Sequence, residues 1–198
     1  MSTQQTSPVQ QAPTTVRGAT GNAYFPIAFV ARFPFAMMVV GTLTLVVSAR
    51  DSIALGGLNA AVVGLGPALV GPLLGAAADR WGQRPVILLA GIVNSMTLLA
   101  MAAVAFSSLP DAAVLAVGFL IGASSPQIGP FSRSRLLQLI LTKLPPQRHA
   151  RSLSGTMGYE SAADETAFVF GPVVVGLLAT TMNPAAPMIG AAILTLVF

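Results

Sequence analysis

The stretch Gly75–Arg84, reading GAAADRWGQR, decides how the rest of the chain is organised. Five of its residues carry charge or backbone freedom: Gly75, Asp79, Arg80, Gly82 and Arg84. The sequence on both sides is apolar for about the length of a bilayer, so these charges must lie where a helix leaves the membrane. The stretch therefore predicts a tight cytoplasmic hairpin between two membrane-spanning helices.

The spacing inside this hairpin adds to the prediction. Gly75 lies four positions before Asp79, about one turn back on the same helix face, where another helix could approach the carboxylate closely. Gly82 permits the chain reversal, and Arg84 stands just before Pro85, which suits the first turn of the next helix. A carboxylate and two guanidinium groups at a helix junction can hold neighbouring helix ends in one conformation and release them in another. We therefore predict a conformational latch here.

The composition places the chain among integral membrane proteins of the all-α class. The sequence is 54% hydrophobic and only 8% charged, with a mean hydropathy of +0.78, whereas ordinary soluble domains have about a quarter of charged residues. The 10 basic and 6 acidic residues cluster in a few loops without interleaved aromatic residues. Membrane orientation explains them better than nucleic-acid binding does. The absence of cysteine excludes disulfides, thiolate catalysis and thiolate metal sites.

The chain divides into a tail and one bundle. Residues 1–24 are expected to form a disordered cytoplasmic tail, because the sequence up to Gly21 is rich in Gln, Thr, Pro and Ala and has no apolar run. Residues 25–198 are expected to form a transmembrane bundle with spans at about 27–49, 53–78, 85–106, 112–130, 161–182 and 187–198. The last span would be about 18 Å long at about 1.5 Å per residue, against a hydrocarbon core of about 30 Å. We therefore expect the sixth helix to stop inside the membrane.

The basic residues predict the orientation. A cytoplasmic N-terminus leaves Arg50 outside and puts eight basic residues on the inner side: Arg17, Arg80, Arg84, Arg133, Arg135, Lys143, Arg148 and Arg151. The positive-inside rule favours this arrangement. We predict a multi-pass protein of the cell (inner or plasma) membrane with its N-terminus in the cytoplasm.

The hairpin also carries a resemblance. Its pattern Gly75-x-x-x-Asp79-Arg80-x-Gly82-x-Arg84 resembles the signature loop between the second and third helices of the major facilitator superfamily of secondary transporters. It matches every defining position except Gln83, where the family usually has a further basic residue. The resemblance implies a six-helix transporter half-bundle made of two inverted three-helix repeats. It also implies a second bundle, onto which the latch residues would dock in one of two rocking states, commonly driven by a proton gradient.

An internal repeat fits this architecture. Gly-Pro-x-x-x-Gly occurs once in span two and once in span five, which would be equivalent helices running in opposite directions. Proline removes a backbone hydrogen bond and bends a helix, while small residues allow close packing. We predict helix bending in the cavity-lining helices at Gly66, Pro67, Gly71, Gly171, Pro172 and Gly176. The Gly-Pro pair of span five also resembles a signature often found in exporters.

Polar residues within the spans are candidates for a cavity or for ion coupling. Arg32 either reaches the cytoplasmic headgroups or faces the central cavity as the partner of an anion or acid. Glu160 and Asp164 share a helix face, so their charges repel unless Arg133, Arg135 or another cation compensates them.

The remaining candidates are Glu165, Asn94 and the patch around Pro126. Acids at the start of span five are favoured by the helix dipole, or Glu165 reaches the interior and binds a proton or a substrate cation. Pro126 leaves a backbone carbonyl in mid-membrane without its helical hydrogen-bond donor. Either a substrate or the side chains of Ser124, Ser125 and Gln127 can donate to this carbonyl. Asn94 either holds neighbouring helices together by hydrogen bonding or binds the substrate. Gly118 stands where the family often has an arginine with a proton-linked role, so that role is in doubt here.

The function predicted from these features is transmembrane transport of a small solute by alternating access. We expect ion-coupled efflux by the N-terminal half of a major facilitator type transporter. The alternative is a non-transporting membrane sensor or structural subunit, or an inactive truncated fragment. The expected partners are a small-molecule substrate, membrane lipid, protons, and the missing C-terminal bundle or a second chain, but no nucleic acid. An enzyme is disfavoured because nucleophile, zinc and phosphate-loop motifs are absent and His149 is the only histidine, so no cofactor or metal is expected.

Overall fold

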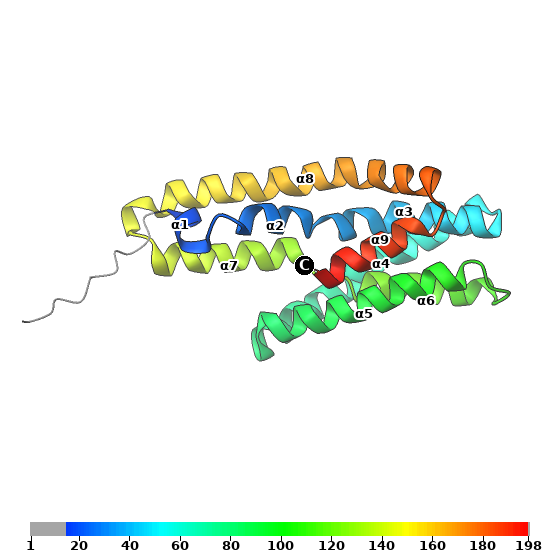
Figure 1. The fold of residues 1–198 in the computed structure, drawn as a ribbon. Helices are drawn as coiled ribbons and strands as arrows, with labels where there is room; N and C mark the ends of the chain where they lie inside the picture. The colour runs from blue at the N-terminus through cyan, green and yellow to red at the C-terminus, as the bar shows by residue number, and fades with distance from the viewer. Residues whose placement is uncertain (1–14, 198) are drawn as a thin grey trace, which may run out of the picture.

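The computed structural model describes residues 15–197, which are folded into helices without any strand (Figure 1). The expectation of an all-α protein is therefore confirmed for this part of the chain. In chain order the helices are α1 (Val16–Thr20), α2 (Tyr24–Val30), α3 (Phe33–Arg50), α4 (Ile53–Trp81), α5 (Gln83–Val104), α6 (Asp111–Ala123), α7 (Ile128–Lys143), the 3₁₀ turn η1 (Pro146–Arg148), α8 (His149–Thr181) and α9 (Ala186–Val197).

Five helical segments are long and apolar enough to cross a membrane. They are Tyr24–Arg50, Ile53–Trp81, Gln83–Val104, Asp111–Lys143 and Pro146–Thr181. α9 is apolar but has only 12 residues. These lengths indicate a multi-pass membrane protein, whereas the arrangement as two inverted repeats remains a prediction.

Several helix boundaries differ from those expected. α6 ends at Ala123 rather than near Pro130, and α7 begins at Ile128. α8 begins at His149, well before the expected start at 161. The residues before 161 are polar, so the hydropathy of the sequence did not predict this extension. The stretch that connects the fourth and fifth expected spans is helical, and α7 packs against α8 and buries Leu136 and Ile140.

The end of the expected tail is also folded. Residues 1–14 lie outside the described part of the chain, but α1 and the start of α2 occupy residues that we expected to be disordered. Thr15 caps α1, since its side-chain oxygen accepts a hydrogen bond from the Gly18 amide at 3.1 Å.

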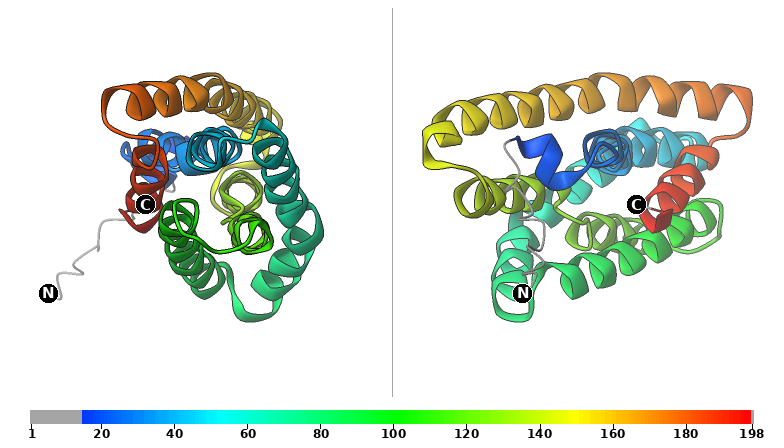
Figure 2. Two further views of the ribbon diagram at one scale, coloured as in Figure 1. Left: turned by 90° about the vertical axis from the view of Figure 1, so that its right-hand side faces the viewer. Right: turned by 60° about the vertical axis from the view of Figure 1, so that its left-hand side comes forward.

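The bundle is organised around α3. Figures 1 and 2 show α3 in the middle, in contact with α4, α8 and α9, while α4 packs along α6 and α5 packs along α9. The core contains fully buried side chains such as Met37, Leu45 and Leu98. Large apolar side chains on the outside are exposed, including Leu73 and Leu88 at 66% each, as expected for surfaces that face lipid.

Glycines allow two close helix contacts. A Cβ atom at Gly66 of α4 would collide with the backbone of Gly122 and Ala123 in α6. A Cβ atom at Gly171 of α8 would meet the backbone of Ala36 in α3 at 3.0 Å. These two glycines therefore let neighbouring helices approach each other, which is the role of small residues in membrane helix packing.

The helices are not interrupted at the predicted bending positions. α4 runs through Pro67 and Pro72, and α8 runs through Pro172, as continuous helices. Gly71 lies beside the Gln127 side chain, whereas a Cβ atom at Gly176 would meet no atom within 4 Å. The chain breaks its helices elsewhere, between α2 and α3 and between α6 and α7.

The α4–α6 contact makes a prediction about stability. Gly66→Ala should lower the free energy of unfolding by about 1–3 kcal/mol, because the added methyl group overpacks the contact with the α6 backbone. The measurement is unfolding in mixed micelles titrated with a denaturing detergent. Gly64→Ala is the matched control, since nothing lies within 4 Å of a Cβ atom at that position of the same helix. Equal losses in the two variants would contradict the proposed contact.

Candidate functional site

The break between α2 and α3 leaves a backbone carbonyl free to accept a hydrogen bond from a side chain. Pro34, in the first turn of α3, has no amide hydrogen to continue the helix. The Arg32 amide donates to the Phe29 carbonyl at 3.1 Å, one residue short of the helical pattern. The Ala28 carbonyl is thereby freed, and Arg32 Nη1 donates to it at 2.5 Å. The break therefore supplies the first acceptor for the arginine.

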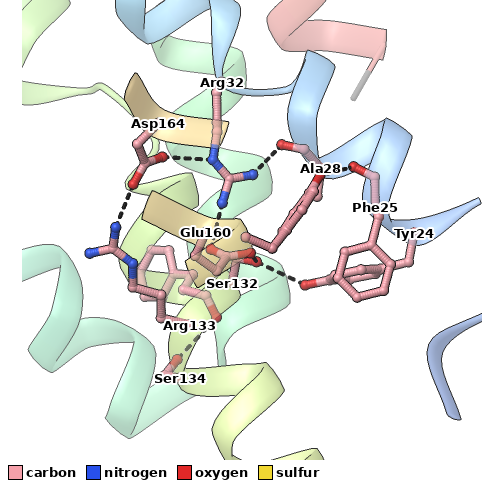
Figure 3. A network of polar contacts seen from close by, with 11 residues as sticks. Tyr24, Phe25, Ala28, Arg32, Ser132, Arg133, Ser134, Glu160 and Asp164 are labelled. Atoms are coloured by element: carbon pink, nitrogen blue, oxygen red, sulfur yellow. Dashed lines mark hydrogen bonds and ion pairs between the residues drawn. The ribbon is translucent and has the colours of Figure 1, made fainter. Parts of the chain in front are cut away.

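Two carboxylates of α8 complete the surroundings of Arg32 (Figure 3). Arg32 Nη2 donates to Glu160 Oε2 at 2.5 Å, and Arg32 Nε donates to Asp164 Oδ1 at 2.7 Å. The two acids lie four residues apart and therefore on one face of α8. Every nitrogen of the guanidinium group thus has an acceptor, with each acceptor on a different residue.

The helix α7 adds donors to the same two acids. Arg133 Nη2 donates to Asp164 Oδ2 at 2.5 Å, and Ser132 Oγ donates to Glu160 Oε1 at 2.9 Å. The Tyr24 hydroxyl lies 2.9 Å from Ser132 Oγ. All four carboxylate oxygens are therefore paired, and the two positive charges balance the two negative ones. We call Tyr24, Arg32, Ser132, Arg133, Glu160 and Asp164 the charge network.

Burial within the charge network is uneven. The side chains of Arg32 and Glu160 are 3% and 0% exposed, whereas those of Asp164 and Arg133 are 25% and 42% exposed. Removing a charged group from water costs several kcal/mol, which a buried pair recovers only with good geometry and fully satisfied hydrogen bonds. The inner pair is thus sealed, and the outer pair remains accessible.

The network lies near the start of the segment Tyr24–Arg50 and near the middle of the segment Pro146–Thr181. From Arg32 to Arg50, and from Asp164 to Thr181, the helices rise about 25–27 Å at about 1.5 Å per residue. The hydrocarbon core is about 30 Å thick. At the far end, Arg50 Nε donates to the Ala105 carbonyl at 2.8 Å and so ties α3 to the end of α5.

Comparison with known proteins assigns no family. No family model, curated protein or solved structure matches this chain. Within residues 15–197 there is also no group of three or more histidine or acidic side chains that could hold a metal ion. The chemistry of the site must therefore be inferred from its own residues.

The sequence candidates near the charge network fall into two groups. Arg32 contacts two acids and Arg133 supplies the second compensating cation, while the expectation that Arg32 faces a central cavity stays a prediction. Arg135 instead lies over the ring of Tyr24, 5.9 Å from its centroid. Glu165 is exposed on α8 and forms no ion pair within the described residues. It is therefore not part of the network.

The break between α6 and α7 holds the other polar candidates. Asn94 Nδ2 donates to the Ile121 carbonyl at 2.8 Å, and Ser124 Oγ donates to the Leu120 carbonyl at 2.6 Å. Ser125 Oγ is buried without a hydrogen-bond partner among residues 15–197 and lines a cavity of about 190 Å³ together with Asn94.

A smaller cavity connects this break with the charge network. Its volume is about 100 Å³, and Gln127 lines it beside Arg32 and Asp164. The accessible side of Asp164 therefore adjoins space that a small ion or a polar group can enter.

The hairpin reverses where expected. Gly82 has φ +90°, a value that favours glycine, and it separates α4 from α5. Asp79, Arg80 and Arg84 are exposed and form no ion pair with any described residue, and a Cβ atom at Gly75 would meet nothing within 4 Å. The hairpin is instead tied to α7 by a hydrogen bond of 2.9 Å from Gln83 Nε2 to Ser134 Oγ.

Two residues of the network, Tyr24 and Ser132, were not considered in the sequence analysis. Ser132 lies 108 residues from Tyr24 and 28 residues from Glu160 along the chain, and neither Tyr24 nor Ser132 is charged, so no sequence pattern connects them. For the charged members the signal was charge balance: two acids one turn apart on an apolar helix require cations, and Arg32 is a cation within an apolar segment that requires an acid.

The buried pair makes a second stability prediction. Glu160→Gln should lower the free energy of unfolding by about 3–5 kcal/mol, because it leaves the Arg32 charge buried with one fewer counter-charge. Glu165→Gln, at an exposed site on the same helix, should leave stability unchanged. The measurement is the same detergent titration.

A double variant tests whether the Arg32 and Glu160 side chains interact. Arg32→Gln combined with Glu160→Gln removes both charges and leaves the Asp164–Arg133 pair, so its loss should be smaller than the sum of the two single losses. Strictly additive losses would show that the two side chains do not interact.

Proposed function

We propose that this chain takes part in ion-coupled efflux of a small solute by alternating access, as the N-terminal half of a transporter of the major facilitator type. The observation that carries the proposal is the charge network, which joins three helical segments within an apolar bundle. Ionisable groups inside membrane proteins are costly and mark substrate or ion pathways.

The uneven burial supports a role in coupling. Arg32 and Glu160 form the sealed part, while Asp164 shares its charge between Arg32 and Arg133 and adjoins the cavity at Gln127. A proton or a substrate cation that reaches Asp164 can replace Arg133 as its partner. The contact between α7 and α8 then weakens without any charge leaving the sealed pair. Such an exchange gives two discrete arrangements of the helices, as alternating access requires.

The hairpin supports the same proposal. Asp79 lies in the last turn of α4, where the helix dipole disfavours a negative charge. Its position is therefore not explained by helix capping and suits an acid that binds a cation on another bundle. The resemblance of the hairpin to the major facilitator signature loop implies that this partner is the second half of the transporter.

The test of transport uses proteoliposomes. The protein as encoded by its gene is reconstituted with an imposed pH gradient and a pH-sensitive dye, and a panel of small solutes is added. We expect at least one solute to dissipate the gradient, and Asp164→Asn to abolish this while membrane insertion is retained. Asp51→Asn, an acid-to-amide change in an exposed turn outside the network, is the matched control. Undiminished proton flux in the Asp164 variant would refute the coupling role.

The latch makes a separate prediction. Asp79→Asn should abolish transport while leaving insertion and thermal stability intact, because Asp79 has no ion-pair partner within residues 15–197 whose loss would destabilise this bundle. Solute flux in the same vesicles measures the effect, again against Asp51→Asn. Normal flux in the Asp79 variant would count against the latch and would leave the charge network untouched.

A further inference from the structure

A cavity of about 530 Å³ lies between α2, α5 and α7 and adjoins the charge network, whose uncharged members Tyr24 and Ser132 line it. Its polar lining includes Tyr24, Arg84 and Arg135, and its apolar lining includes Ile27, Ala31 and Leu88. The two arginines come from different helices and face one space. Neither forms an ion pair with a described residue.

The cavity changes from polar to apolar in the same direction on all three helices. Tyr24 begins α2 and Ala31 follows its end, while Arg84 lies in the first turn of α5 and Leu88 one turn further. α7 runs the other way, so its first residue, Ile128, lies at the apolar end and Arg135 at the polar end. At about 1.5 Å per residue the change takes about 6–10 Å.

This gradient matches the depth of a membrane interface. Arg84 opens a membrane-spanning helix, so the polar end of the cavity lies at the level where such helices leave the lipid. Ile27 and Leu88 are 47% and 66% exposed along the apolar end. The cavity therefore presents two cations at headgroup level and an open apolar wall below them.

We propose that this cavity binds an anionic phospholipid, with its phosphate between Arg84 and Arg135 and an acyl chain along Ile27 and Leu88. Basic pockets between membrane helices recognise anionic headgroups by this combination of charge and depth. A soluble anion would use the arginines but leave the apolar wall without a ligand. This assignment does not rest on transport activity.

The position of the lipid also connects it to the charge network. Arg135 lies over the ring of Tyr24, whose hydroxyl contacts Ser132, which in turn donates to Glu160. A phosphate held by Arg135 would keep α7 against α2 and α5. Because a ligand that binds the folded state stabilises it, the lipid raises the thermal stability of the bundle.

The experiment compares phosphatidylglycerol with phosphatidylcholine of identical acyl chains. Lipid bound to the purified chain is measured by native mass spectrometry and by thermal unfolding. We expect phosphatidylglycerol alone to bind and to stabilise. Arg84→Gln with Arg135→Gln should weaken its binding about 30-fold, from roughly fivefold for each arginine near a membrane surface.

The control removes equal charge elsewhere. Arg17→Gln with Arg151→Gln affects two arginines of the groove between α1 and α8 and should leave phosphatidylglycerol binding within about twofold of the unaltered chain. Equal binding in the Arg84/Arg135 variant and the control would overturn the proposal. Displacement of the lipid by inorganic phosphate at the same concentration would also overturn it, because the site would then recognise a soluble anion.

Discussion

The fold at one end of this bundle depends on the need to neutralise a guanidinium group that has been taken out of water. Arg32 is 4% exposed, so both its charge and its hydrogen-bond donors require partners inside the protein. Meeting that need fixes three segments at once: the helix break that frees the Ala28 carbonyl, the extension of α8 that carries Glu160 and Asp164, and α7, whose Arg133 balances the second acid. The stability of this end of the bundle therefore depends on each buried charge keeping its partners.

Much of this fold follows from the sequence, and the remainder has an identifiable cause. Hydropathy is sufficient to predict the membrane class, and Gly82 is sufficient to predict where the hairpin turns. Hydropathy misplaces the start of α8, because the residues before 161 are polar and become helical through tertiary contacts that a local pattern does not contain. Charge balance predicts that Glu160 and Asp164 need cations, yet it leaves Arg133, Arg135 and others as equal candidates. Only the packing of α7 against α8 distinguishes Arg133 from Arg135.

Whether a proline interrupts its helix also depends on the surrounding structure. Pro67, Pro72 and Pro172 each remove a backbone hydrogen bond, but their helices continue. Near Pro34 the helix does break, and there the Arg32 side chain donates to the Ala28 carbonyl, with which the Arg32 amide does not pair. Proline alone therefore does not decide whether a membrane helix is interrupted. Gly66 and Gly171, the glycines beside Pro67 and Pro172, allow close helix contacts, while bending at these positions stays a prediction.

Three consecutive residues of α7 connect the features on which function would depend. Ser132 contacts Tyr24 and Glu160, Arg133 binds Asp164, and Ser134 accepts the hydrogen bond from Gln83 of the hairpin. Successive residues of a helix point about 100° apart, so these three side chains reach the partners on different sides of α7. A rotation or shift of α7 therefore cannot break one contact and keep the others at their present geometry. The hairpin, the buried acids and the wall of the cavity between α2, α5 and α7 must therefore change together. A change of charge at Asp164 would thus reach the hairpin through α7.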